Sequence, residues 1–242
     1  MKLGVITDIH NNLTALRAVA EKLNQMECDK MICCGDIIGI GPFPEETVQY
    51  IMQIPNLIAV RGNHEKYLLE GMPSRYPNGE NMGLEEMKHH KWEHNLLSSE
   101  SIHFLESLPY KINLTCEGFS ISVMHYCMDC EGHYMNNQYT ANPSEDDLKK
   151  MFADVNSDII LYGHNHCGNI CNSDKFYINV GSLGCPAQDK NVARAGVVKL
   201  DKGKAEVQTI DVEYDVNEVI RLIDEINYPD AENIKKYFYG LW

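Results

Sequence analysis

The first third of the chain alternates short apolar runs with longer stretches in which apolar residues recur every three or four positions. The apolar runs predict strands over Lys2–Thr7, Met31–Cys34 and Leu57–Val60. Helical spacing predicts a helix over Leu13–Met26, and a shorter one over Glu45–Ile54 follows a proline. Strands that alternate with helices are typical of βαβ units, so the pattern predicts an α/β fold with a mainly parallel sheet.

The same patterns predict further elements in the rest of the chain. Apolar residues at alternate positions from Lys111 to Tyr126, with Gly118 near the middle, predict a hairpin. Turn-forming residues predict an exposed excursion over Tyr67–Asn81 and a loop over Tyr126–Pro143. Helices are expected over Met82–Leu97, Ser99–Leu108, Val216–Ile226 and Ala231–Tyr239, and strands over Asp158–Tyr162, Phe176–Val180, Ala195–Leu200 and Ala205–Val212.

The length of the chain favours one domain. It has 242 residues, and no linker-like stretch divides it. We therefore expect a single domain over residues 1–242, with a helical excursion near 67–108 and a helical C-terminal tail near 215–242.

The acidic composition narrows the classes of partner. The formal net charge is −14. Phosphate backbones and anionic lipids are held mainly by Lys and Arg, so neither general nucleic-acid binding nor a membrane surface is expected. No apolar run approaches membrane-spanning length, and the nine scattered cysteines are predicted to be free thiols of a cytoplasmic protein. A phosphorylated substrate would have to be met by local charge, which bound cations supply well.

Residues that suit metal ligation follow the first three predicted strands. Asp8 and His10 come after the first strand, Asp36 after the second, and Asn63 and His64 after the third. In open α/β sheets, ligands bind at the carboxyl ends of the strands. One site can therefore collect all three turns.

Three more histidines extend this series. His164 and His166 lie two positions apart directly after an apolar strand, whereas His125 stands alone on a strand and its assignment rests on the set. Imidazole suits Mn²⁺, Fe and Zn²⁺, and the two oxygens of Asp36 suit a bridge between two ions. The ordered series predicts a two-metal centre for phosphoester cleavage.

These pieces match the motifs DxH, GD, GNH[ED], H and GHxH of the calcineurin-like metallophosphoesterases, in the family's order, over roughly residues 1–185. The chain resembles that family. The resemblance implies an α/β fold, a four-layer αββα sandwich of two mixed sheets flanked by helices. It implies two divalent ions, Mn²⁺ and/or Fe, with Zn²⁺, Ni²⁺ or Co²⁺ as alternatives. One ion is assigned to Asp8, His10, Asp36 and His166, and the other to Asp36, Asn63, His125 and His164.

The resemblance also implies a reaction. Two ions lower the pKa of a bridging water from about 15.7 towards about 7 and orient the hydroxide for in-line attack at phosphorus. The leaving oxygen needs a proton, and in the family the histidine at the position of His64 supplies it as general acid. Glu65 is expected to orient His64 or to stabilise its charge.

The segment after Asp36 distinguishes branches of the family. Ser/Thr protein phosphatases carry GDxxDRG there, whereas Gly39 and Ile40 occupy the Asp and Arg positions here. Gly35–Pro42 resembles instead the GDxVGYGP of bacterial single-domain phosphoesterases, and Asn179–Pro186 resembles their NPGSVGQP.

That branch includes small phosphodiesterases and asymmetrical diadenosine tetraphosphate hydrolases. We therefore expect a phosphoric ester hydrolase acting on small phosphodiesters or dinucleoside polyphosphates. A protein Ser/Thr phosphatase and a non-catalytic scaffold of the same fold are the alternatives, and the oligomeric state is left open.

Four residues are candidates for substrate contacts, each with a structural alternative. Asn12 is placed to donate to phosphate or to cap a helix. Arg61 and Arg194 are the cations nearest the motifs, and either can have a structural role. Tyr126, like Tyr134 and Tyr139 in the same loop, can stack on a nucleobase or pack on its own scaffold.

A stretch with several histidines offers a competing metal site. His90 and His94 are four positions apart beside Trp92, close to His89. We interpret His90 and His94 as decorating a helix face.

Overall fold

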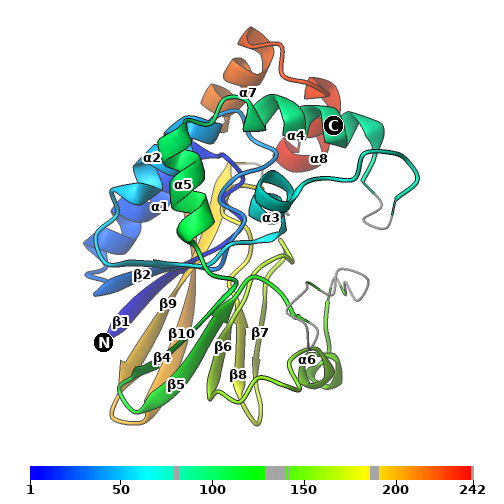
Figure 1. Cartoon of the computed structure of the whole chain (residues 1–242). Coiled ribbons are helices and arrows are strands. Elements are labelled where there is room, and N and C mark those ends of the chain that lie inside the picture. Colours follow the sequence, from blue (N-terminus) through cyan, green and yellow to red (C-terminus); the bar gives the residue numbers. More distant parts are fainter. Residues whose placement is uncertain (79–81, 129–133, 135–139, 141, 186–190, 241–242) are drawn as a thin grey trace.

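The protein consists of two mixed sheets that lie face to face with helices on their outer faces (Figure 1). This computed structural model describes residues 1–78, 82–128, 134, 140, 142–185 and 191–240. The arrangement is the predicted αββα sandwich.

The first sheet contains the predicted βαβ strands and the last hairpin. Its strands are β1 (Lys2–Ile6), β2 (Lys30–Cys33), β3 (Leu57–Ala59), β9 (Val192–Asp201) and β10 (Lys204–Glu213). They lie in the order β10-β9-β1-β2-β3. β1, β2 and β3 run parallel, with Gly4 opposite Met31, whereas β9 is antiparallel to both β1 and β10.

The second sheet begins with the predicted hairpin. Its strands are β4 (Lys111–Cys116), β5 (Phe119–Met124), β6 (Ile159–Leu161), β7 (Asn169–Asn172) and β8 (Phe176–Asn179). They lie in the order β4-β5-β6-β8-β7. β5, β6 and β8 are parallel, and β4 and β7 are antiparallel edge strands.

Alternation along the strands sorts apolar side chains into separate cores. Leu3 and Val5 join Ile121 and Ile159 in the core between the sheets, while Ile6 packs in the core under the helices. Successive side chains of a strand point to opposite faces. The central strands are therefore buried on both sides, which explains the continuous apolar runs of β1, β2 and β6, whereas positions alternate in the outer strands β4, β7 and β10.

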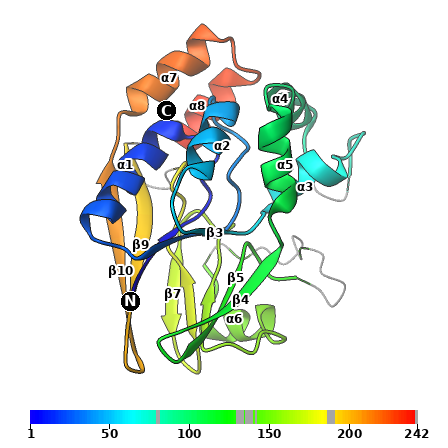
Figure 2. The same cartoon turned by 60° about the vertical axis from the view of Figure 1, so that its left-hand side comes forward.

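Five helices contribute apolar side chains to the core on the outer face of the first sheet. They are α1 (Leu13–Gln25), α2 (Pro44–Met52), α5 (Ser99–Ser107), α7 (Val216–Glu225) and α8 (Ala231–Tyr239). Figure 2 shows α1, α2 and α5 side by side over this sheet. α6 (Glu145–Met151) covers the outer face of the second sheet.

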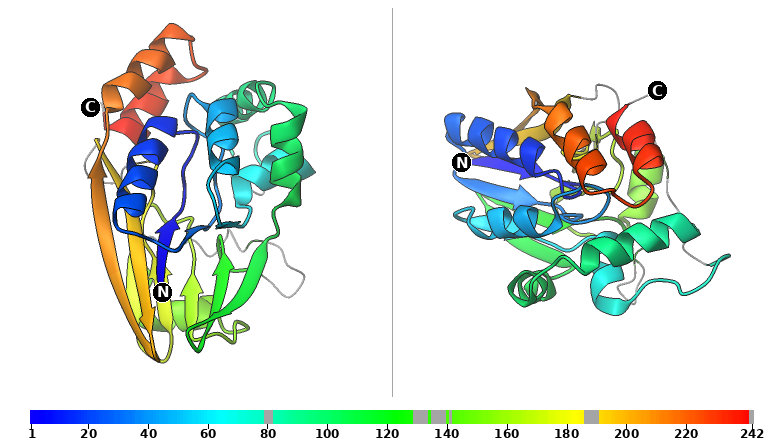
Figure 3. Two further views of the ribbon diagram at one scale, coloured as in Figure 1. Left: turned by 90° about the vertical axis from the view of Figure 1, so that its left-hand side faces the viewer. Right: turned by 90° about the horizontal axis from the view of Figure 1, so that it is seen from above.

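Helices also gather above one end of the two sheets. α3 (Asn63–Glu70) and α4 (Leu84–His94) lie there beside α8, and α7 stands above α1 (Figures 1 and 3). These helices enclose the end of the sandwich at which β1, β2 and β3 finish.

Three elements were missed by the sequence patterns. α3 extends to Glu70, so the prediction of a loop from Tyr67 onward is wrong over the first four residues. α6 has seven residues and β7 has four, which leaves too few positions to establish a hydrophobic period. Most of the loop predicted over Tyr126–Pro143 lies outside the described residues.

Among the described residues, no helix has both the length and the apolar character that a membrane span requires. The interpretation of the chain as one domain stays a prediction.

Candidate metal and catalytic site

The carboxyl ends of strands from both sheets bring the predicted donors together. Asp8, Asp36 and Asn63 follow β1, β2 and β3 in the first sheet. His125 follows β5 and His164 follows β6 in the second. Because these strands are parallel within each sheet, their ends meet at one edge of the sandwich.

The turns that carry the donors are held in a conformation that side chains rarely adopt. Asp8, His10, Asp36 and His164 all have positive φ, between 50° and 69°. Neighbouring turns stabilise one another, because the Asp8 N–H donates to the Gly35 carbonyl at 3.0 Å and the His10 N–H to that of Asp36 at 3.1 Å. Left-handed backbone costs roughly 1–2 kcal/mol per residue, and such strain is concentrated at functional sites.

Two glycines allow these turns to approach one another. A Cβ on Gly62 would lie 2.1 Å from Oδ1 of Asp36. A Cβ on Gly163 would lie 2.0 Å from Oγ1 of Thr7 and 2.8 Å from Oδ2 of Asp8. The glycines of the GNH and GHxH motifs are therefore required by packing against the donor residues.

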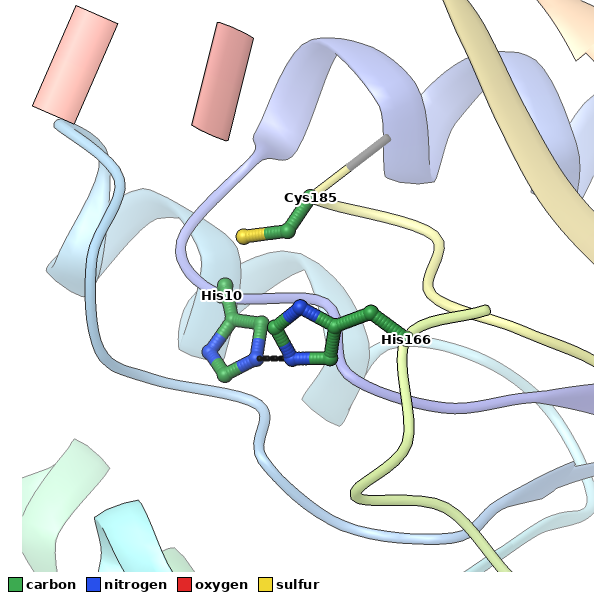
Figure 4. A group of neighbouring side chains, drawn as sticks. All are labelled: His10, His166 and Cys185. Carbon is green, nitrogen blue, oxygen red and sulfur yellow. Dashed lines mark hydrogen bonds between the residues drawn. The ribbon is translucent and has the colours of Figure 1, made fainter. Parts of the chain in front are cut away.

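The first group of donors lies around His10 and His166. Their Nε2 atoms are 3.0 Å apart (Figure 4). Oδ1 of Asp8 is 3.5 Å from Nε2 of His166 and 3.7 Å from Nε2 of His10. Oδ2 of Asp36 lies 4.0 Å from Nε2 of His10.

The second group lies around Asn63. Its Oδ1 is 3.1 Å from Nε2 of His125 and 3.0 Å from Nδ1 of His164. Oδ2 of Asp36 is 3.1 Å from Nε2 of His125, so the same carboxylate borders both groups. The seven predicted donors thus form two clusters that share Asp36.

The donor set fits two divalent ions. Atoms about 2.1 Å from one ion lie roughly 3.0–3.4 Å from their neighbours around it, close to most of the separations here. The far ring nitrogens are held by backbone, since Nδ1 of His125 is 2.8 Å from the Cys34 carbonyl and Nδ1 of His10 is 3.3 Å from that of Ile38. This contact directs each Nε2 into the cluster.

The charges of the site are mutually dependent. Burial disfavours the charged carboxylates of Asp8 and Asp36, but neighbouring imidazoles more than offset it and hold both pKa values well below the usual range. Burial also disfavours a charged His125, yet Asp36 and Asp8 raise the pKa of this imidazole to about 9. Two buried carboxylates therefore create a strong demand for positive charge at this point.

His64 lies at the edge of both groups. The backbone N–H of His64 donates to Oδ1 of Asp36 at 3.0 Å, and its ring Nε2 is 3.9 Å from Oδ2 of Asp36. A Cβ on Gly39 would lie 2.1 Å from Nδ1 of His64, so the missing side chain is what makes room for the ring. Gly39 stands where protein phosphatases carry an aspartate, and the ring of His64 occupies the space that a side chain at this position would need.

Comparison with known proteins identifies the family. The model of the calcineurin-like phosphoesterase superfamily domain matches residues 1–203. The chain belongs to this superfamily. It is also 28% identical, over 251 residues, to an uncharacterized protein of Methanocaldococcus jannaschii, with 94% of each chain covered.

Two solved structures share the fold of this metallophosphoesterase. One is a metallophosphoesterase from Sphaerobacter thermophilus, with a TM-score of 0.72, 21% identity and 98% of each chain covered. The other is a hypothetical protein of Pyrococcus horikoshii, with a TM-score of 0.82, 19% identity and 99% and 98% of the two chains covered. The family that the five motifs predicted is confirmed, and with it a metal-dependent hydrolase.

Glu65 has a different place from the one expected. Its buried carboxylate accepts hydrogen bonds from the N–H groups of Asp36, Ile37, Ile38 and Gly62, at 2.6–3.1 Å. No described contact joins it to His64. Burial and the charge of Asp36 raise the pKa of Glu65 to about 7, while the N–H donors favour its charged form. In this metallophosphoesterase Glu65 fixes the turn that carries Asp36.

The histidines of α4 correct a second expectation. His89 and His90 are buried rather than on the helix surface, because α4 packs against both the site and the C-terminal helices. The His90 ring centroid is 5.0 Å from that of His64, and its Nδ1 lies 2.7 Å from Oε1 of Glu93. Burial lowers the pKa of His90 to about 4 and raises that of Glu93 to about 7.

Glu93 also connects α4 to the turn after β1 that carries Asp8 and His10. Its Oε2 accepts a hydrogen bond of 2.7 Å from Nδ2 of Asn11, the residue after His10. The sequence offered one signal for this contact, since Asn11 stands where the family usually has glycine. Its partner was not recognisable, because a glutamate on a polar helix is typical of an exposed face.

Cys185 is a further neighbour that was not predicted. Its thiol lies beside His10 and His166 (Figure 4) and is buried. Burial raises the pKa of Cys185 well above its usual value, so the group there is a neutral thiol.

Asn12 and Tyr126, two of the four predicted substrate contacts, have structural roles near the site. Oδ1 of Asn12 accepts the N–H of Ala15, which caps α1, and Nδ2 donates to the Gly184 carbonyl. Tyr126 is buried, with its ring centroid 4.4 Å from that of His164. The structure therefore favours the capping and packing alternatives over substrate contact for these residues.

The two arginines also bind other parts of the protein. Arg61 donates to the carbonyls of Leu108 and Glu106 and lies 4.9 Å from the Tyr110 ring centroid. Arg194 donates to the Cys167 carbonyl, and its Nε is 3.4 Å from Oδ1 of Asp211. These contacts favour the structural alternative for both arginines, and their role in substrate binding stays a prediction. Tyr139 lies outside the described residues, and the hydroxyl of Tyr134 donates to the Arg61 carbonyl.

Proposed function

We propose that this metallophosphoesterase is a dinuclear enzyme that hydrolyses small phosphodiesters or dinucleoside polyphosphates. The observation that carries the proposal is the pair of donor clusters sharing Asp36, with His64 at their edge. A small phosphorylated molecule is the proposed partner, because the acidic chain offers little other attraction for phosphate.

The proposed ligands form two sets that share Asp36. Asp8, His10, Asp36 and His166 would hold one ion, and Asp36, Asn63, His125 and His164 the other. When bound, two ions supply an activated water and polarise the phosphoryl oxygens. The ligand set of imidazole, carboxylate and amide, without thiolate, suits Mn²⁺ and Fe, and the other first-row ions share it.

His64 is the proposed general acid. Burial lowers the pKa of His64 well below its usual range, so its ring is neutral before substrate binds. An anionic phosphate close to the ring would favour the charged form and raise the pKa. His64 would take up a proton from solvent as the substrate binds and pass it to the leaving oxygen as the bond to phosphorus breaks.

Metal removal and one substitution test this function. Chelation is expected to abolish hydrolysis of bis(4-nitrophenyl) phosphate, and Mn²⁺ to restore it. On an alkyl phosphodiester, whose alkoxide leaving group needs a proton, His64→Ala is expected to lose about 10²- to 10⁴-fold in kcat while retaining two ions per chain by elemental analysis. His103→Ala, which changes an exposed histidine of α5, serves as the control. Full activity of His64→Ala would refute the acid role, and metal-independent hydrolysis would refute the proposal.

A further inference from the structure

A cavity opens beside the catalytic site between α4 and α8. Its volume is about 470 Å³, within the range of small-molecule sites. His64 and His166 form the wall towards the metal clusters, while Asp230 and Tyr237 belong to the C-terminal helical segment opposite. The cavity is therefore continuous with the proposed general acid.

The position of His64 defines what the cavity can hold. A general acid must lie within hydrogen-bond reach of the oxygen that leaves. The group attached to that oxygen then extends past His64, away from the metal clusters. The space beyond His64 on this side is the cavity under α8.

Apart from the wall formed by His64 and His166, the polar lining of the cavity is acidic or neutral. Asp230 and Glu86 supply carboxylates, and Nδ2 of Asn233 donates to Oδ1 of Asp230 at 2.7 Å. None of the described lining residues is a lysine or arginine. The ammonium of Lys236 lies 5.5 Å from the Tyr237 ring centroid, but Lys236 is not part of the lining.

His89 also belongs to the lining of the cavity. Only 4% of His89 is exposed, yet neither ring nitrogen has a hydrogen-bond partner among the described residues. Burial lowers the pKa of His89 to about 4, so the ring is neutral and offers one donor and one acceptor. Both nitrogen atoms are themselves buried, so they do not face the open cavity, and His89 contributes a neutral wall rather than a hydrogen-bond partner for a ligand.

We propose that this cavity binds the leaving alcohol of the substrate and selects alcohols that carry no negative charge. The proposal rests on the proposed function and narrows its substrate class. The carboxylates of Asp230 and Glu86, with no lysine or arginine in the described lining, favour a cationic alcohol and disfavour an anionic one, while Ile234 and Phe238 suit its apolar part. Esters of amino alcohols or neutral alcohols therefore fit better than dinucleoside polyphosphates, whose leaving group carries phosphate.

Competition by three phosphate esters of similar size tests the selection. The probes are phosphoethanolamine, propyl phosphate and phosphoglycolate, whose alcohols are cationic, neutral and anionic. Each competes with bis(4-nitrophenyl) phosphate on the Mn²⁺-loaded protein. The wild type is expected to bind phosphoethanolamine most tightly and phosphoglycolate most weakly. We define the spread as the ratio of the inhibition constants of phosphoglycolate and phosphoethanolamine. Asp230→Asn is expected to narrow this spread by about 2- to 5-fold, as for a partly exposed charge pair.

Asp230→Asn is matched by a control substitution that changes the net charge by the same amount. Asp230 has φ of 61°, a conformation that asparagine adopts readily, and the amide of the Asp230→Asn variant keeps an oxygen for Asn233. Asp201→Asn removes one exposed charge at the end of β9, away from α8 (Figure 1), and should leave the spread unchanged.

An equal spread in the wild type and Asp230→Asn, or a different order in the wild type, overturns the cavity proposal while Mn²⁺-dependent turnover stands. Equal narrowing by Asp201→Asn also overturns it, because the effect would then be one of net charge. Absence of Mn²⁺-dependent turnover in the wild type overturns the proposed function itself.

Discussion

Single side chains control the geometry of this site, as His64 and Gly39 show. The ring of His64 occupies the place where a Gly39 side chain would begin. Sequence comparison used Gly39 only to distinguish this chain from protein phosphatases. In the structure it has a positive role, since its lack of a Cβ lets the proposed acid reach the donor clusters.

Gly39→Ala is therefore expected to displace His64 and lower kcat by about 10²- to 10⁴-fold, as for loss of a general acid. The control is Gly203→Ala in the β9–β10 turn. Gly39 and Gly203 have φ of 94° and 80°, but a Cβ on Gly203 meets no atom within 4 Å. Both variants add similar backbone strain, so a kcat loss in Gly39→Ala alone supports displacement of the ring. Equal kcat values in the two variants would contradict it.

Residues differ in how far their roles could be predicted. Six of the seven proposed ligands were predictable because each belongs to a short motif that follows a strand, whereas His125 was predictable only as part of the ordered set. Glu65 was placed in the site, but its role was not, because hydrogen bonds to backbone N–H groups depend on how two turns approach. The four candidates for substrate contact were chosen because they lie near a motif. The sequence did not show that their polar groups or rings form hydrogen bonds or pack with other parts of the protein, as they do in Asn12, Arg61, Arg194 and Tyr126.

At the scale of elements, α4 is the least predictable part of the site. Its sequence is polar on most sides, which is typical of an exposed helix. In the structure His89, His90 and Glu93 are buried against the site and the C-terminal helices. A helix that buries polar groups has no hydrophobic period, and only the three-dimensional arrangement shows it.

The pH dependence of stability tests the burial of Glu93. Its pKa is about 7 in the folded protein against about 4.5 when unfolded, so the folded state binds the extra proton. The stability associated with that proton is present below pH 4.5 and is lost as the pH rises through 7. Glu93→Gln removes this loss, and the oxygen of its amide can still accept from His90.

The free energy of unfolding of metal-free Glu93→Gln, relative to wild type, should therefore rise between pH 5 and pH 8 by up to about 3 kcal/mol. Urea denaturation at several pH values measures it. Glu100→Gln, at an exposed position in the first turn of α5, is the control and should show no such trend. Parallel pH profiles for Glu93→Gln and wild type would show that Glu93 keeps an ordinary pKa.

At the scale of the whole molecule, the sandwich explains why donors 158 positions apart in the chain, from Asp8 to His166, meet at one edge. Parallel strands in both sheets end at the same side, and each sheet supplies part of the set. The fold class was predictable from the alternating pattern and the family motifs. The cavity under α8 was not, because it depends on where the C-terminal helices return to the site.

Asp36 is proposed to lie between two metal ions. Crystals of the Mn²⁺-loaded protein, measured at a wavelength that gives an anomalous signal for manganese, test it directly. We expect two anomalous peaks about 3.5–4 Å apart, one beside His10 and His166 and one beside Asn63 and His125, with the Asp36 carboxylate between them. A single peak, or two peaks that do not share Asp36, would contradict it.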